Sequence, residues 1–207
     1  MVETGITPDF ITVDGGEGGT GAAPLEFSNH IGAPLVEGLI FVHNALTGYS
    51  LRDKIKIIAS GKATSGFGLL KRLAIGADAV SSARAMMMAL GCIQALKCNS
   101  NHCPVGVATQ MKHLVAGLDP TDKANRVASY HHETINSLAE MIGALGLDSA
   151  QELRPWHVMH RISANETKHY GELYNFLRGG ELLADVLPPE YARACASASS
   201  ETFGHSS

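Results

Sequence analysis

The 207-residue sequence predicts an α/β fold in which parallel strands alternate with helices. Three short runs rich in apolar and β-branched residues each end in small or polar residues, and apolar positions at helical spacing follow. This alternation is typical of a parallel sheet, because a helix must carry the chain back between parallel strands. Ligands of α/β proteins bind at the carboxyl ends of such strands, so polar residues there are candidate site residues.

Strands are expected at residues 9–14, 54–60 and 79–83. Helices are expected after them, at 37–51, 67–75 and 86–96, and a longer one at 123–145. Gly76 ends the second of these helices, and Asp119-Pro120 starts the long one. Ser149 and Glu152 offer a capping box for a further helix.

Glycine is concentrated directly after the first strand. The segment 15–21 holds five glycines in seven positions: Gly15, Gly16, Gly18, Gly19 and Gly21. Such density indicates a backbone that approaches something closely or adopts positive φ, and a surface turn is the alternative. The spacing is not that of a dinucleotide fingerprint. Asp14 and Glu17 are carboxylates that act either as acid or base or as caps of the loop's own amides.

Candidate phosphate ligands follow the other two strands. Gly61 and Lys62 come after the second strand, Ser82 lies at the end of the third, and Arg84 comes just past it. In a barrel the last two strand ends, with a helix N-terminus, form the usual phosphate site because free N–H groups point at the anion. The alternative is that Lys62 and Arg84 are solvated surface residues.

Three of the four cysteines, Cys92, Cys98 and Cys103, lie in one short window. Residues 99–101 are turn formers, and Pro104 ends any helix beyond Cys103. The spacings are wider than those of structural zinc sites, so an iron centre is favoured over zinc. Three buried thiols without a metal are the alternative.

The residues 14–24, 60–62 and 91–110 together resemble the FMN-binding domain of the glutamate synthase large subunit, in particular the stand-alone FMN-binding glutamate synthases. The resemblance implies the C-terminal portion of a (βα)8 TIM barrel of the FMN-linked oxidoreductase type, with the sixth to eighth strands present and helices following. It implies that FMN is held by the glycines at 15, 16, 18 and 19 with Gly61, Lys62, Ser82 and Arg84. A 3Fe-4S cluster is then held by Cys92, Cys98 and Cys103.

The implied reaction reduces 2-iminoglutarate, formed from 2-oxoglutarate and ammonia, to L-glutamate. Electrons are expected from ferredoxin or from an NAD(P)H-oxidising subunit, through the cluster to FMN. No residue of the chain is singled out as the catalytic acid or base. The alternatives are a non-catalytic metal-binding remnant and a phosphate-binding barrel fragment of another enzyme with one nucleophilic cysteine.

The sequence divides into 1–110, the βα units with the iron–sulfur loop at 92–106, then 111–163, a helical closing segment, and 164–207, a helical or irregular extension. The extension is expected to be disordered from Ala194, and residues 1–7 resemble the tail of a preceding helix. A complete barrel needs about 250 residues. We therefore expect the first five strands to be absent, so that the chain is a fragment or pairs with a chain that supplies them.

Charge and composition exclude several functional classes. Sixteen basic against 20 acidic side chains give a net charge of −4, which indicates neither nucleic-acid nor anionic-membrane binding. No apolar run is long enough for a membrane span, and no signal peptide is evident, so a cytoplasmic protein is expected. His131 and His132 are expected to be packed or solvent-exposed, because adjacent positions on a helix point in different directions and do not easily share an ion. His157 and His160 are expected to be structural, because no carboxylate or cysteine nearby completes a site.

Overall fold

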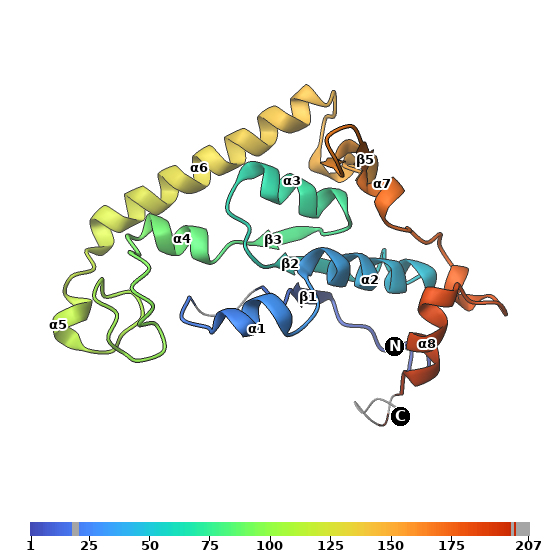
Figure 1. The fold of residues 1–207 in the computed structure, drawn as a ribbon, viewed down its shortest axis with the longest axis horizontal. Coiled ribbons are helices and arrows are strands. Elements are labelled where there is room, and N and C mark those ends of the chain that lie inside the picture. Colours follow the sequence, from blue (N-terminus) through green and yellow to red (C-terminus); the bar gives the residue numbers. More distant parts are fainter. Residues whose placement is uncertain (18–20, 200, 202–207) are drawn as a thin grey trace.

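A three-stranded parallel sheet forms the centre of the computed structural model, which describes residues 1–17, 21–199 and 201. The strands β1 (Phe10–Asp14), β2 (Lys56–Ser60) and β3 (Ala79–Ser81) lie side by side in that order (Figure 1). Asp14 pairs with Ser60, and Ser60 with Ser81, so the three carboxyl ends meet at one edge. The predicted parallel α/β arrangement is confirmed, whereas closure into a barrel stays a prediction.

Two helices cover one face of this sheet. α2 (Leu35–Gly48) follows β1, and α3 (Gly66–Ala74) follows β2. Ile57 and Ala59 of β2 point to this side and are fully buried in a core with Leu35, Leu39 and Ile75. On β1 the alternate residues face away from the core, and Phe10 is 56% exposed. The sheet therefore has a packed face and an open face.

The long helix α6 (Pro120–Ala144) crosses the ends of α3 and α4 (Arg84–Ala89) (Figure 1). Asp119 caps it, as predicted, by accepting a hydrogen bond from the Thr121 N–H at 3.0 Å. Gly66 lets the backbones of α3 and α6 approach each other closely, because a Cβ on Gly66 would lie only 2.8 Å from the Leu138 nitrogen. The start of α3 is therefore held against α6.

One helix prediction in the first half of the chain is wrong in its length, and one helix was not expected. The helix expected over 86–96 is α4, which ends at Ala89, because Gly91 has a φ of +100° and Gln94 and Leu96 also have positive φ. Residues 1–5 form a single turn, closed by the Gly5 N–H and the Met1 carbonyl, and their place at the end of a preceding helix stays a prediction. The short helix α1 (Leu25–His30) was not expected.

The chain after α6 is built from short elements. They are the 3-10 turns η1 (Ala150–Glu152), η2 (Pro155–His157) and η3 (Glu181–Leu183), the antiparallel pair β4 (Met159–Arg161) and β5 (Thr167–His169), and the helices α7 (Tyr170–Leu173) and α8 (Pro189–Ser197). The short helix α5 (Lys112–Val115) lies before α6. The predicted capping box at Ser149 starts only η1, and its side chain makes no capping bond.

The C-terminal segment folds back onto α2. Asn44 is buried and donates to the Asn175 carbonyl at 2.8 Å and to the Tyr191 hydroxyl at 2.7 Å. Cys195 lies 3.2 Å from the Tyr49 hydroxyl. The expectation of disorder from Ala194 is therefore wrong as far as Ser197, where α8 ends; residues 200 and 202–207 lie outside the described part.

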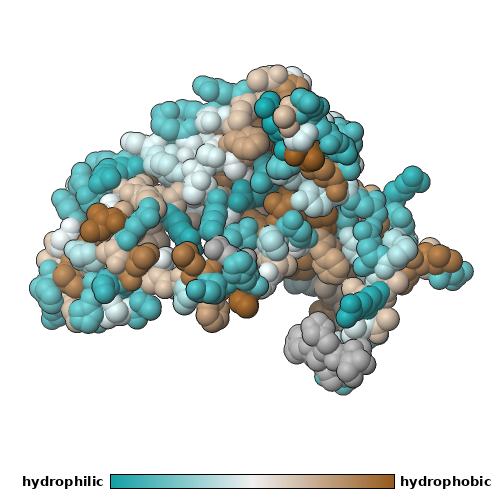
Figure 2. Space-filling model, viewed as in Figure 1, coloured by the Kyte–Doolittle hydropathy of each residue, from teal (hydrophilic) through white to brown (hydrophobic). Residues whose placement is uncertain are grey.

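The ends of the molecule differ in their surface. α5 and the cysteine loop, residues 92–106, lie at one end of the long axis, and α8 lies toward the other (Figure 1). Apolar side chains are exposed among polar ones over α1 and the cysteine loop (Figure 2), where Leu25 is 73% and Ile93 66% exposed. None of the described helices has both the length and the apolar character needed to cross a membrane.

Candidate functional site

The first residues, 15–17, of the glycine loop (residues 15–21) lie at the carboxyl end of β1. The Gly15 N–H donates to the Ser60 carbonyl at 3.1 Å, and the Gly16 N–H to the Ala33 carbonyl at 2.7 Å. A Cβ on Gly15 would lie 2.6 Å from the Leu35 Cβ, so only glycine fits. The predicted close approach is thus an approach to the chain's own α2. Gly18 and Gly19 lie outside the described residues.

Glu17 holds this loop against the start of α2. Its two carboxylate oxygens accept hydrogen bonds from the Leu35 N–H at 2.9 and 3.2 Å. A carboxylate at a helix N-terminus is favourable because it pairs with a free N–H and with the positive end of the helix dipole. Glu17 therefore caps α2 rather than the amides of its own loop, and a role as acid or base stays untested.

The β2–α3 loop, residues 61–65, has an unusual backbone. Gly61 has a φ of +141° and Lys62 a φ of +44°, a region that few lysines adopt. The Lys62 side chain is exposed. Ser65 caps α3 by accepting a hydrogen bond from the Gly68 N–H at 3.1 Å. The two predicted residues Gly61 and Lys62 therefore form the strained part of a loop that leads into a helix N-terminus.

Three side chains from different elements bind the carbonyls of this loop. Arg72 Nη2 donates to the Gly61 carbonyl at 2.6 Å, and the Ser82 hydroxyl donates to the Ala63 carbonyl at 2.7 Å. The Tyr130 hydroxyl of α6 donates to the Thr64 carbonyl at 2.6 Å. Ser82 thus ties the second strand end to the third. Contact between Ser82 and a phosphate stays a prediction.

Arg72 is a buried residue that sequence reasoning missed. Its side chain is only 8% exposed, and Nη1 also donates to the Gly68 carbonyl at 2.7 Å. Burial lowers the pKa of Arg72, while the nearby charge of Glu17 raises it. An arginine keeps its charge at neutral pH even so. In the sequence, only the position of Arg72 among the apolar residues of a short helix could have indicated that it is buried.

The cysteine loop meets the glycine loop and the start of α4. Cys92 and Cys98 line a cavity of about 120 Å³ together with Gly21 and Arg84. A Cβ on Gly21 would lie 3.5 Å from the Cys98 sulfur. The structure thus brings Gly21, which is far away in the sequence, beside the predicted ligand Arg84 and the two cysteines.

All three cysteines of the window line a second, smaller cavity with apolar side chains around it. Cys103 is 7% exposed, and the pKa of its thiol is lowered chiefly by the Ala108 N–H and also by the N–H groups of residues 105–107, while burial opposes the shift. Within the described ranges, no three His, Cys, Asp or Glu side chains are arranged around one metal ion. The cavity that the three cysteines share has a volume of only about 10 Å³, and binding of a cluster by these cysteines stays a prediction.

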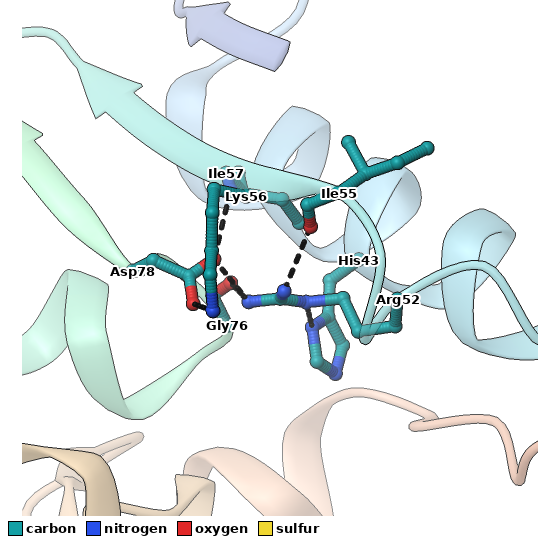
Figure 3. A network of polar contacts seen from close by, with 7 residues as sticks. All are labelled: His43, Arg52, Ile55, Lys56, Ile57, Gly76 and Asp78. Atoms are coloured by element: carbon teal, nitrogen blue, oxygen red, sulfur yellow. Dashed lines mark hydrogen bonds and ion pairs between the residues drawn. The ribbon is translucent and has the colours of Figure 1, made fainter. Parts of the chain in front are cut away.

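The amino ends of β2 and β3 carry a different polar network (Figure 3). Arg52 donates to the carbonyls of Ile55 and Gly76, each at 3.0 Å, and forms an ion pair with Asp78 at 2.7 Å. Asp78 also accepts from the Ile57 N–H at 2.8 Å. Burial raises the pKa of Asp78, but the Ile57 N–H, Arg52 and Lys56 together outweigh it, so the pKa lies below its ordinary value.

His43 completes this amino-end network. Its Nδ1 accepts a hydrogen bond from Arg52 Nε at 3.2 Å (Figure 3). Burial, followed by the charge of Arg52, lowers the pKa of His43 to about 4, against opposing effects of Asp78 and the Gly76 carbonyl. The network borders a cavity of about 930 Å³ that extends to Trp156 in the C-terminal segment.

Residues 2–148 match the conserved region that defines the glutamate synthases. The chain belongs to the glutamate synthase family. It is 41% identical to the glutamate synthase large subunit-like protein YerD of Bacillus subtilis, over 78% of this chain and 31% of that protein. It is 40% identical to the archaeal glutamate synthase [NADPH] of Methanocaldococcus jannaschii, over 70% of this chain and 29% of that protein.

The chain is also similar to a third glutamate synthase and, weakly, to a solved structure. The ferredoxin-dependent glutamate synthase of Antithamnion sp. is 38% identical over 70% of this chain and 9% of its own length. The flavin-binding domain of baker's yeast flavocytochrome b2 overlaps 74% of this chain and 29% of its own, with a TM-score of 0.41 and 19% identity, and this weak likeness places no residue. The chain spans less than a third of the length of these relatives.

The glutamate synthase region includes every residue of the predicted site. The glycine loop, the β2–α3 loop and the cysteine loop all fall within residues 2–148, and the predicted family resemblance is confirmed. The C-terminal segment that folds back onto α2 begins after this glutamate synthase region.

Proposed function

We propose that this chain is the part of a glutamate synthase-type oxidoreductase that binds FMN and a 3Fe-4S cluster. One observation carries the proposal: the glycine loop, the β3–α4 connection and the cysteine loop adjoin one cavity, where Gly21, Arg84, Cys92 and Cys98 meet. Strand-end loops of a parallel sheet are where cofactors bind. Membership of the family supports assigning these loops to its cofactors.

The β2–α3 loop and the adjoining β3–α4 connection are the proposed site of the FMN phosphate. The Lys62 N–H has no acceptor among the described residues, and the first N–H groups of α3 lie close by in sequence. Such groups bind anions because they carry partial positive charge. Lys62 and Arg84 add full charges. Gly15, Gly16, Gly18 and Gly19 complete the proposed flavin site.

The three cysteines of the 92–106 loop are the proposed cluster ligands. Cys92, Cys98 and Cys103 share one cavity with apolar walls, which limits access of water. The N–H groups that surround the Cys103 sulfur favour its thiolate form, the form that binds iron. Because Cys92 and Cys98 also adjoin Arg84, the cluster and the flavin would be close enough for electrons to pass between them.

In the proposed reaction 2-iminoglutarate, formed from 2-oxoglutarate and ammonia, takes up two electrons and two protons to give L-glutamate. FMN supplies the two-electron step when bound. The relatives' names include both NADPH- and ferredoxin-dependent enzymes, so the electron donor is ferredoxin or an NAD(P)H-oxidising partner. The open edge of β1 is where we expect the N-terminal half of the barrel to pair, in a cytoplasmic enzyme.

We assign residues 1–110 to the cofactor-binding βα units, 111–163 to a closing segment and 164–207 to an extension. The test is to purify the protein produced from its native gene without air, and to measure flavin and iron. We expect both, and equal loss of iron in Cys→Ser variants at positions 92, 98 and 103. The matched control is Cys195→Ser, which lies beside Tyr49 and should keep its iron.

Two outcomes would contradict this proposal. Loss of function at only one of the three cysteines would favour a nucleophilic thiol in a different enzyme. A protein that contains iron but binds no FMN would favour a metal-binding remnant.

A further inference from the structure

The guanidinium of Arg72 is bound entirely to backbone. It donates to the Gly61 carbonyl at the end of β2 and to the Gly68 carbonyl in the first turn of α3, at 2.6 and 2.7 Å. Its Nε has no hydrogen-bond partner among the described residues. A buried arginine usually pairs with a carboxylate, because burying a charge is costly. Here the charge is used to hold two carbonyls.

The bound carbonyls fix the direction of the N–H groups that follow them. In a trans peptide the C=O of one residue and the N–H of the next point in opposite directions. Because Arg72 fixes the Gly61 carbonyl toward the protein interior, the Lys62 N–H must point away from it. Ser82 and Tyr130 fix the carbonyls of Ala63 and Thr64 in the same way, and so orient the next two N–H groups.

These oriented N–H groups are left without acceptors. Among the described residues, nothing accepts a hydrogen bond from the N–H of Lys62, Thr64 or Ser65. Unpaired donors on a loop are normally satisfied by water or a ligand. The positive φ of Lys62 is a strained conformation, which persists only where the surroundings hold it. Arg72 lies on the interior side of the loop, where it holds the Gly61 carbonyl next to Lys62 and also places a positive charge.

We propose that Arg72 is a positioning residue, which orients the N–H groups of the β2–α3 loop toward an anion. This inference rests on the proposed function, in which the anion is the phosphate of FMN. Arg72 itself is buried and makes no contact with the ligand. Its contribution is to keep the peptide planes of residues 61–64 from rotating when the phosphate is absent, so that the donors are already in place.

FMN and riboflavin provide the test, because they differ only in the phosphate. The ratio of their dissociation constants measures the phosphate contacts separately from the stability of the protein. In the complete gene product we expect the wild type to prefer FMN. Arg72→Met should reduce that preference about tenfold, the size of one charge-assisted hydrogen bond. Arg72→Lys keeps the charge but has one nitrogen in place of the Nη1 and Nη2 that reach the two carbonyls, and should fall between.

Arg52→Met is the matched control. Arg52 also donates to two backbone carbonyls, but at the amino ends of the strands. Its replacement should lower the urea midpoint and leave the FMN preference unchanged. Should Arg72→Met fail to fold, Tyr130→Phe tests the same idea, since it removes only the bond to the Thr64 carbonyl; we expect a loss of preference of roughly threefold.

The outcomes distinguish this inference from the proposed function. If the wild type prefers FMN and the folded Arg72 or Tyr130 variants keep the full preference, the positioning role is wrong and the proposed function stands. If the wild type binds neither flavin, both are wrong. An equal loss of preference in Arg52→Met would also overturn the inference, because the effect would then be one of general stability.

Discussion

The two ends of the parallel sheet are each tied together by an arginine with little exposed surface, and the two arginines have different partners. At the amino ends Arg52 binds two carbonyls and is also paired with the carboxylate of Asp78. At the carboxyl ends Arg72 binds two carbonyls and no carboxylate, since the Glu17 oxygens bind the Leu35 N–H. Both arginines hold loops in place, but only one is neutralised by a direct partner.

The different partners of the two arginines indicate that the amino end of the sheet stabilises the fold, whereas the carboxyl end is proposed to bind a ligand. At the amino end the Asp78 carboxylate accepts from Arg52, Lys56 and the Ile57 N–H, so the charges there are used within the protein. At the carboxyl end Arg72 holds two carbonyls, and the N–H groups of Lys62, Thr64 and Ser65, which have no acceptor among the described residues, are the proposed anion donors. This matches the general division in α/β barrels, where sites form at the carboxyl ends and the opposite end stabilises the fold.

The largest effect is expected from Asp78→Ala at the amino end. It leaves Arg52 without its ion-pair partner and the Ile57 N–H without an acceptor. We expect the free energy of unfolding in urea to fall by about 3 kcal/mol. Asp53→Ala, at an exposed aspartate on the same turn, is the control and should change it by less than about 0.5 kcal/mol. An equal effect of the two variants would show that the network is not a stabilising unit.

A pH-dependent loss of stability is expected from His43, with its folded-state pKa of about 4 against an ordinary 6.5. The unfolded chain binds a proton on His43 below pH 6.5, whereas the folded chain does not until about pH 4. Stability should therefore fall as the pH drops through this window, by roughly 3 kcal/mol in all, and stay constant above pH 7.

Urea unfolding between pH 7.5 and 4 measures this dependence. His43→Gln should have a shallower slope than the wild type, and the exposed control His132→Gln should keep the wild-type slope. Equal slopes in the wild type and His43→Gln would mean that His43 is not held neutral by the amino-end network.

A smaller effect is expected from Gly15→Ala at the carboxyl end. The new Cβ would overlap Leu35 at the start of α2, and we expect a cost of about 2 kcal/mol. Because the glycine loop would shift, flavin binding should weaken as well. Gly143→Ala in α6 is the control, since a Cβ there meets nothing within 4 Å, and it should be neutral or slightly stabilising. Unchanged stability and flavin binding in Gly15→Ala would remove the glycine loop from the proposed site.

The elements predicted most accurately are those with a long or alternating apolar pattern. The three strands fall within the predicted ranges, and α3 begins one residue before the predicted Phe67, after the Ser65 cap. The end of α4 was misplaced because the apolar spacing continues to Leu96, whereas Gly91, a poor helix former, has a positive φ and ends the helix soon after Ala89. β4 and β5 have three residues each, too few for an alternating pattern to be recognised.

The sequence by itself determined the family, the parallel α/β order and the residues proposed to bind cofactors, because these depend on local pattern and on short motifs. Only the tertiary structure decided that the glycine loop packs against α2, that Gly21 and Arg84 lie beside the cysteines, and that Arg72 lies behind the β2–α3 loop. Such contacts join residues far apart in the chain or depend on the direction of a single side chain. Residue spacing and hydrophobic periodicity do not predict these contacts, because both describe only residues that are near one another in the sequence.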